Sequence, residues 1–375
     1  MVLDTDIALI EDGELFLRGV SAAELALKYP YESVARWLWG SELQASAPVF
    51  APDEYAIASA RAAVAALGGA ETPLDRVQVA VPVLGAADPT RHDLDPDAVR
   101  AVAERMIAGV VVTLGGPVLP SSPAEKSRVA MTARELPRNS TSPTGEGAPE
   151  PGGLAAAVWQ AFTDRTPSAA EVRALNAALV LLVDHDLAVS TLAARAAASA
   201  RATPYAVVSS GLGALDSALH GNASGAACEL IRLVLAGTDA RTALAQTVAR
   251  TARPAPGFGH SLYPGIDARA GILLPLVAKL PEGAAVVDAV NRLAAEVLSR
   301  TGRHPNVDLA LAALTIAARM PSDAGAAIFA IGRMAGWIAH ALDEYGQRPL
   351  RLRPRGRYVG PDAGTPARTA TAADE

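Results

Sequence analysis

Alanine-rich segments with helical spacing of apolar residues occupy most of this sequence. From residue 166 they follow one another with few interruptions, from TPSAAEVRALNAALVLLV to AGAAIFAIGRMAGWIAHAL. Alanine has the highest helix propensity, and its small side chain lets helices pack closely. Ser21 with Glu24, and Ser168 with Glu171, have the spacing of capping boxes, which predicts a helix start at each serine. Little of this part resembles a β-strand, so the sequence predicts an all-α fold.

Other stretches depart from the helical pattern. Asp12-Gly13 lies between two apolar stretches, which predicts a β-hairpin with a type I′ turn. Residues 117–153 are rich in Pro, Ser, Thr and Gly, and we interpret them as a mobile loop. Residues 361–375 are small and polar, and we interpret them as a disordered tail.

Composition limits the partners and the compartment. The chain has 375 residues, 50% of them hydrophobic, enough for one large domain or for a large and a small one. Its net charge of -6 and pI near 5.6 argue against a nucleic-acid surface. Cys228 is the only cysteine, so no intrachain disulfide is expected. The acidic start is not a secretory signal, and charged or titratable residues interrupt LNAALVLLVDHDLAVSTL, the stretch closest to membrane-spanning length. We therefore expect a cytoplasmic protein without a membrane or nucleic-acid partner.

The histidines are few, and several lie in unusual settings. His185 lies in the middle of a very apolar helical segment, and His220 ends a predicted helix just before a glycine. His260 follows a glycine-rich turn in PGFGHSLYPGIDARAG. His304 precedes PNVD, in which Asp308 opens an apolar helix. These four histidines and this acid are the titratable residues from which a site would be built.

Each of these residues also has a structural interpretation. His185 would be a buried histidine held by Asp184 or Asp186, and His220 would interact with the helix dipole. The histidine of the glycine turn would be an ordinary loop residue, and Asp308 an N-cap or first-turn acid. The sequence has no HExxH or Cys/His metal-ligand spacing, no GxSxG elbow, no Walker loop and no Rossmann fingerprint. No metal site is therefore expected.

Taken together, these residues favour one kind of reaction. Arg269, Arg333 and Arg353 lie in apolar settings, and arginine binds carboxylates bidentately and stays charged when partly buried. A carboxylate such as that of Asp308 takes a proton from a carbon next to a carbonyl when a donor stabilises the enolate. A second histidine would polarise a ketone. This is the arrangement for a carbon–carbon condensation on a small polycarboxylate.

The sequence resembles the citrate synthase family over nearly its whole length. The matching blocks occur in the family's order: ALNAALVLLVDHDLAVSTLAARAAAS, GLGALDSALHGNAS, PGFGHSLYPGIDARA, PNVDLALAAL, FAIGRMAGWIAHALDE and LRPRGRYVG. The N-terminal DGELFLRGVSAAELALKYPYESVARWLWGSEL resembles the family's opening hairpin and helix. The resemblance implies an almost entirely α-helical homodimer with a cleft between two domains. The large domain would comprise residues 1–221 and 319–375, and the small domain residues 222–318.

The resemblance also implies roles for single residues. Asp308 matches the base that takes a proton from acetyl-CoA, His220 the group that stabilises the enol, and His260 the group that polarises the ketone of oxaloacetate. Residues matching the substrate-binding positions are His185, Arg269, Arg333 and Arg353, the last reaching into the site of the partner subunit. Those matching the CoA-binding positions are Gly257, Phe258, Gly259 and Asn306. No cofactor is implied, since acetyl-CoA is a substrate.

Five positions depart from the family pattern. Leu182 replaces a histidine, Asn222 a glycine, Ser261 an arginine, Pro264 a lysine and, as a mild change, Ala268 a proline. The leading hypothesis is the synthesis of citrate from oxaloacetate and acetyl-CoA. The alternatives are 2-methylcitrate synthesis from propionyl-CoA, a condensation on another 2-oxo acid, and a non-catalytic protein that binds a dicarboxylate or a CoA ester. Binding alone would not require Asp308, which argues against the last.

Overall fold

The computed structural model describes residues 3–115, 153–217, 223–251 and 255–360. These ranges form helices and one small sheet, which confirms the predicted all-α fold. The helices before the first long gap are α1 (Ala22–Lys28), α2 (Tyr31–Leu38), α3 (Glu54–Ala65), α4 (Pro73–Ala87) and α5 (Pro96–Thr113). Those that follow are α7 (Leu154–Phe162), α8 (Ala169–Leu182), α9 (Val189–Ser199), α10 (Pro204–Leu215), α11 (Ala223–Leu235), α12 (Ala240–Thr251), α13 (Ala268–Val277), α14 (Gly283–Thr301), α15 (Val307–Ala317) and α16 (Ala324–Tyr345). Residues 117–152 of the predicted loop and the tail at 361–375 lie outside the described residues.

The sheet contains the predicted hairpin. β1 (Ala8–Glu11) pairs antiparallel with β2 (Glu14–Leu17), and a third short strand, β3 (Val20–Ser21), pairs with β2. Asp12 and Gly13 both have positive φ, 51° and 81°, as a type I′ turn requires. The hairpin prediction is therefore confirmed.

One of the two predicted capping boxes forms. The Ser168 hydroxyl accepts from the backbone N–H of Glu171 (3.3 Å), and the Glu171 carboxylate accepts from the Ser168 N–H (2.7 Å). The box predicted at Ser21 is wrong, because the side chain of Ser21 caps nothing and its backbone belongs to β3. The Glu24 carboxylate instead accepts from Lys28, four residues later on the helix.

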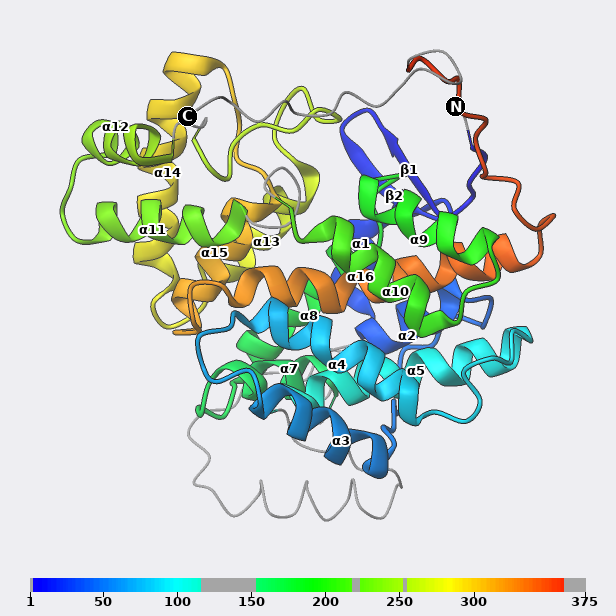
Figure 1. Cartoon of the computed structure of the whole chain (residues 1–375). Helices are drawn as coiled ribbons and strands as arrows, with labels where there is room; N and C mark the ends of the chain where they lie inside the picture. Colours follow the sequence, from blue (N-terminus) through cyan, green and yellow to red (C-terminus); the bar gives the residue numbers. More distant parts are fainter. Residues whose placement is uncertain (1–2, 116–152, 218–222, 252–254, 361–375) are drawn as a thin grey trace, which may run out of the picture.

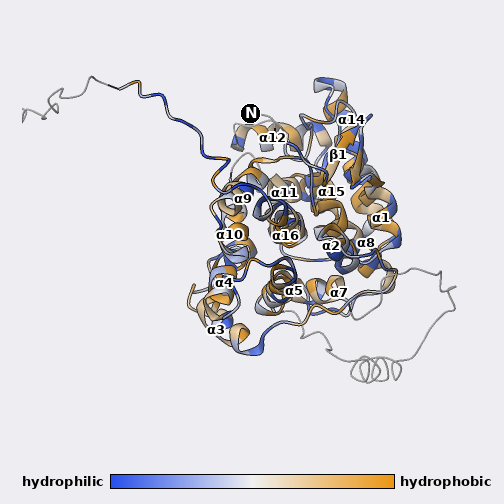
Figure 2. Cartoon of the chain, turned by 90° about the vertical axis from the view of Figure 1, so that its right-hand side faces the viewer, coloured by the Kyte–Doolittle hydropathy of each residue, from blue (hydrophilic) through white to orange (hydrophobic). Residues whose placement is uncertain are grey.

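Helix α16 forms the centre of the core. Every residue from Ala324 to Ala341 is buried, and Figures 1 and 2 show α16 near the middle of the molecule with other helices around it. Gly336 allows close contact with α8, since a Cβ there would lie 1.9 Å from the carbonyl oxygen of Val183. By length and composition alone this one described helix could cross a membrane, but 94% of its most apolar window is buried inside the protein.

Helices α11 to α15 pack against one another and gather at one end of α16 (Figure 1). Helix α15 also packs against α16 and α8, and α13 against α8. These five helices fall within residues 222–318, the range predicted as the small domain, and that boundary stays a prediction. Their loops face the segment between α8 and α9, and the site lies there.

Candidate active site

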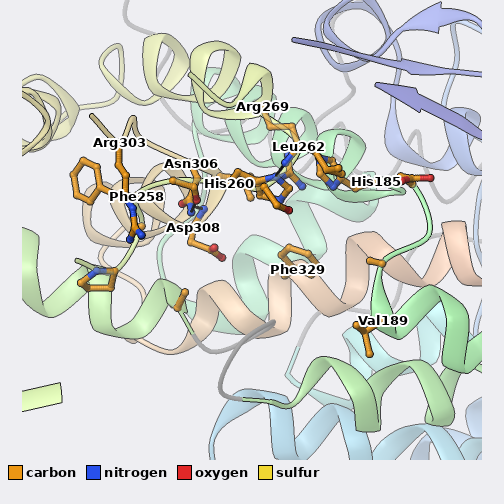
Figure 3. Close-up of a pocket in the computed structure, with 18 of the residues that line it drawn as sticks. His185, Val189, Phe258, His260, Leu262, Arg269, Arg303, Asn306, Asp308 and Phe329 are labelled. Carbon is orange, nitrogen blue, oxygen red and sulfur yellow. Dashed lines mark hydrogen bonds between the residues drawn. The ribbon is translucent and has the colours of Figure 1, made fainter. Parts of the chain in front are cut away.

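A cavity of about 920 Å³ lies between the loops of α11–α15 and helices α8, α9 and α16. Figure 3 shows side chains from both sides pointing into it, with His185 at one end and Arg303 at the other. The predicted site residues that line it are His185, Gly257, Phe258, Gly259, His260, Arg269, Asn306, Asp308 and Arg333. The structure thus brings together residues that lie up to 148 positions apart in the sequence, from His185 to Arg333.

Two predicted residues are not in this group. His220 lies outside the described residues. Arg353 is exposed on the segment after α16 and does not line the cavity of its own chain; Figure 2 shows this segment extending away from the helices. Nearby, Arg351 pairs with the buried Glu344 and holds the start of that segment on α16.

Backbone hydrogen bonds hold together the two loops that carry most of the site. The N–H of Gly259 donates to the carbonyl of His304 (2.8 Å), and the N–H of Asn306 donates to that of Gly257 (3.0 Å). The amide of Asn306 also donates to the carbonyl of Gly259 (3.0 Å). Gly257 has φ of 81°, and a Cβ there would lie 2.8 Å from Cβ of Leu309. The glycine turn is therefore required by this close packing against α15.

Asp308 lies in the first turn of α15, with its partly buried carboxylate in the cavity. Asn306 is the N-cap residue, since its side chain accepts from the N–H groups of Asp308 (3.1 Å) and Leu309 (3.4 Å). Of the two structural interpretations of Asp308, the N-cap is therefore wrong and the first-turn acid is correct. Within the described residues, no hydrogen bond or ion pair holds its carboxylate. Burial raises the pKa of Asp308 to about 6, with Arg269 opposing the rise and Asp267 adding to it. A carboxylate in this state is a stronger base than a solvated one.

Arg269 is buried and already paired. Its Nε and Nη2 donate to the carboxylate of Asp267 (3.0 and 2.8 Å), which also caps α13 and accepts from the N–H of Val307 (3.0 Å). Burial disfavours the charge of Asp267, but Arg269 and these hydrogen bonds hold its pKa below the usual value. The predicted carboxylate-binding role of Arg269 therefore rests on its remaining nitrogen, Nη1. The sequence analysis missed Asp267, although an aspartate before a predicted helix is a typical N-cap signal.

Arg333 differs sharply from Arg269. It is 1% exposed, and its Nε donates to the carbonyl of Leu182 (2.6 Å), but Nη1 and Nη2 are buried without a hydrogen-bond partner. Its guanidinium lies over the ring of Phe329, 4.8 Å from the ring centre. Burial lowers the pKa of Arg333 to about 10, with Asp184 opposing this and Arg269 adding to it. A charged fork with two unsatisfied donors on a cavity wall is suited to a carboxylate.

Leu182, which replaces a family histidine, is fully buried and does not line the cavity. It takes part through its backbone carbonyl, which positions Arg333. Ser261, which replaces a family arginine, does line the cavity. The replacement at Ser261 therefore changes the cavity wall directly, and the one at Leu182 does not.

The two histidine rings lie edge to face, with centres 4.8 Å apart. His260 accepts on Nδ1 from the N–H of Leu262 (3.1 Å), so the neutral ring carries its proton on Nε2. Burial and the charge of Arg269 lower the pKa of His260, which keeps it neutral and a hydrogen-bond donor. Nε2 of His185 lies 3.0 Å from the hydroxyl of Tyr263, whose pKa burial raises to about 12. The sequence analysis missed this tyrosine.

One of the two acids expected to hold His185 binds another histidine. Asp184 lies 3.1 Å from Nε2 of His340, and both are fully buried. Nδ1 of His340 in turn faces Arg195 (3.4 Å), which pairs with Glu344. This buried series connects the loop before His185 to α9 and α16. Among the described residues, no group of three or more His, Cys, Asp or Glu side chains could hold a metal ion.

Comparisons with known proteins identify the family that the chain is similar to over most of its length. The family model described as citrate synthase, C-terminal domain, matches residues 1–355. The chain is 30% identical to a 2-methylcitrate synthase of Mycobacterium tuberculosis over 366 residues, covering 93% of this chain and 86% of the relative. It is 28% identical to a citrate synthase of Mycolicibacterium smegmatis, covering 93% and 90%. The citrate synthase of Thermoplasma acidophilum, solved as a ternary complex with carboxymethyl coenzyme A and oxaloacetate, superimposes with a TM-score of 0.74 at 23% identity, covering 99% of this chain and 97% of that one.

Proposed function

The chain belongs to the citrate synthase family of acyl-CoA condensing transferases, and we propose that it condenses acetyl-CoA with oxaloacetate and water to give citrate and CoA. One observation carries the proposal. The Arg333 guanidinium and the Asp308 carboxylate line the same cavity, and neither has an ion-pair partner among the described residues. A cationic fork that needs a carboxylate, beside an acid of raised pKa, matches a carboxylate substrate and a carbon acid.

In the proposed first step, Asp308 takes a proton from the methyl group of acetyl-CoA. A pKa of about 6 leaves most of the carboxylate ionised at neutral pH and makes it more basic than a free aspartate. His220, by resemblance, would donate to the thioester oxygen and stabilise the enol. The nucleophilic carbon would then form the new bond to the ketone carbon of oxaloacetate.

His260 would complete that bond-forming step. His260 lines the cavity, and its Nδ1 accepts from the backbone, which leaves the proton of the neutral ring on Nε2. It would donate to the ketone oxygen and transfer its proton as the alkoxide forms. Water would then hydrolyse the thioester, releasing CoA and citrate.

The carboxylates of oxaloacetate would bind to Arg333, His185 and the free Nη1 of Arg269. Arg353 lies away from the cavity of its own chain, so its predicted role requires a second copy. We therefore propose a homodimer in which each subunit supplies Arg353 to the other, located in the cytoplasm.

The second candidate is 2-methylcitrate synthesis from propionyl-CoA, favoured by the relative named 2-methylcitrate synthase. The cavity wall includes the small side chains of Ala223 and Ala226. The extra methylene of propionyl-CoA changes binding by only about 1–3 kcal/mol, so both acyl groups are plausible substrates on size.

The test is CoA thiol release by the purified protein with oxaloacetate, comparing acetyl-CoA and propionyl-CoA at matched concentrations. We expect release that depends on oxaloacetate, with acetyl-CoA the faster donor. A faster rate with propionyl-CoA would favour the second candidate. No release with either donor would overturn both, and other 2-oxo acids would then be tested in the same assay.

A further inference from the structure

A second cavity of about 500 Å³ adjoins the first across the glycine turn. The two share Phe258, Gly259, His260, Ser261 and Arg303 in their walls. The second is otherwise formed by the loop after His260 and the loop before Pro305. A ligand that enters the first cavity along the glycine turn therefore passes Arg303.

Arg303 is the cation of this region without an acidic partner. No aspartate or glutamate lines the second cavity, and no ion pair forms to Arg303 within the described residues. Ser261 and Pro264, which also line it, are uncharged. Among the described residues, Arg303 is the one arginine or lysine on its wall.

The position of Arg303 is fixed by packing. Its side-chain stem lies over Gly259, where a Cβ would come within 3.1 Å of the Arg303 Cδ. The backbone N–H of Arg303 donates to the hydroxyl of Thr301 (3.2 Å), and the next residue, His304, accepts from Gly259. Figure 3 shows Arg303 beside Phe258, at the end of the cavity opposite His185. The charge thus stands at the end of the cavity opposite His185.

We propose that Arg303 binds a phosphate group of the acyl-CoA. This rests on the proposed function, in which the acyl group reacts at Asp308, and on the CoA-binding positions that the family resemblance implies at residues 257–259. CoA carries a diphosphate and a 3′-phosphate, whose negative charges need a cation outside the reacting centre. Arg303 is exposed, unpaired and held at that place.

The experiment compares Arg303→Gln with wild type on three acyl donors: acetyl-CoA, its dephospho form without the 3′-phosphate, and acetyl-pantetheine without any phosphate. We expect the KM for acetyl-CoA to rise about 10-fold, the loss of one charge-assisted hydrogen-bonded pair, with kcat nearly unchanged. The KM for acetyl-pantetheine should be the same in both proteins. The dephospho donor shows which phosphate is bound. If Arg303→Gln raises the KM for this donor as much as it raises the KM for acetyl-CoA, Arg303 binds the diphosphate. If the KM for this donor does not rise, Arg303 binds the 3′-phosphate.

The matched control is Arg300→Gln, since Arg300 is an exposed arginine near the same helix end that pairs with Glu296 and lines neither cavity. It should leave all three KM values unchanged, whereas Arg303→Lys should keep part of the acetyl-CoA affinity. Equal effects of Arg303→Gln and Arg300→Gln, or an equal KM rise with acetyl-pantetheine, would overturn the proposal. If the wild type releases no thiol, the proposed function fails. Calorimetric titration with CoA then tests Arg303 alone. Arg303→Gln should bind CoA more weakly than wild type, and an unchanged Kd overturns the proposal.

Discussion

Asp308→Asn should make the protein more stable and inactive at the same time. The pKa of Asp308 is raised from 3.8 to about 6 by burial, so the fold favours the protonated acid. Below pH 3.8 the folded and unfolded states both hold the proton, and this residue costs no stability. As pH rises toward 6 the unfolded chain releases the proton first, and wild type loses stability until the folded carboxylate is also ionised. Asparagine has the same shape and no charge, so it avoids that loss.

The size of the effect follows from the two pKa values. At about 1.4 kcal/mol per pKa unit, the variant should exceed the wild type by up to about 3 kcal/mol at neutral pH. At about pH 5 the gap should narrow to about 1.5 kcal/mol, because the folded wild type is then largely protonated. Loss of the base should reduce kcat by about 10²–10⁴-fold. For wild type, kcat should fall about tenfold per pH unit once the pH is below about 6.

Urea unfolding of both proteins at about pH 5 and about pH 7.5 measures the gap, and thiol release measures kcat. Asp288→Asn is the control, because Asp288 is an exposed acid paired with Arg292 on α14. The free energy of unfolding of this variant should differ from that of wild type by less than about 0.5 kcal/mol. An Asp308→Asn protein that is no more stable than wild type at neutral pH would refute the claim that burial of the Asp308 carboxylate destabilises the fold. Near-normal kcat would remove Asp308 as the base.

Two further predictions concern the arginines. Arg333→Met should raise the KM for oxaloacetate about 100-fold. It should not lower the melting temperature, because wild type leaves two buried guanidinium nitrogens unpaired. A large drop in melting temperature with an unchanged KM would indicate a structural arginine instead. Arg353→Ala and Asp308→Asn chains should each be inactive alone. When they are mixed in equal amounts, half of the randomly formed dimers are hybrids, and each hybrid has one complete site out of two, so about a quarter of wild-type activity should return. Verified hybrids without activity would contradict a shared site.

The features that followed from sequence are those fixed by local chemistry. Helical periodicity, the Asp12-Gly13 turn and the Ser168 capping box each depend on a few neighbouring residues, and all three are present. The box at Ser21 failed because the chain turns back at once and pairs Ser21 of β3 with Phe16 of β2, which uses the backbone of that serine. A capping pattern therefore predicts the local structure only where no other pairing uses the same residue.

The site was less accessible to sequence reasoning, because its electrostatics depend on pairing across the fold. The pair of Arg269 with Asp267, two residues earlier, is local, but the lack of a hydrogen-bond partner for Nη1 and Nη2 of Arg333 depends on what packs around α16. Asp184 was one of the two acids expected to hold His185, but it binds His340 from α16, 156 residues away.

This difference between paired and unpaired charges is what we expect of an active site and not of a structural pocket. Burying an unpaired charge costs several kcal/mol, and a fold selected for stability alone would pair Arg333 as it pairs Arg269. Arg333 is instead held by a single backbone carbonyl, on the helix that is most deeply packed in the core. The dense packing of α16 offsets the cost and keeps the guanidinium from moving toward an acid. Asp308 is kept unpaired in the same way, because Asn306 takes the capping role at the start of α15 and leaves the carboxylate to the cavity. Both charged groups are thus available for the roles that we propose, Arg333 for a carboxylate of oxaloacetate and Asp308 for the acidic C–H of the acyl-CoA.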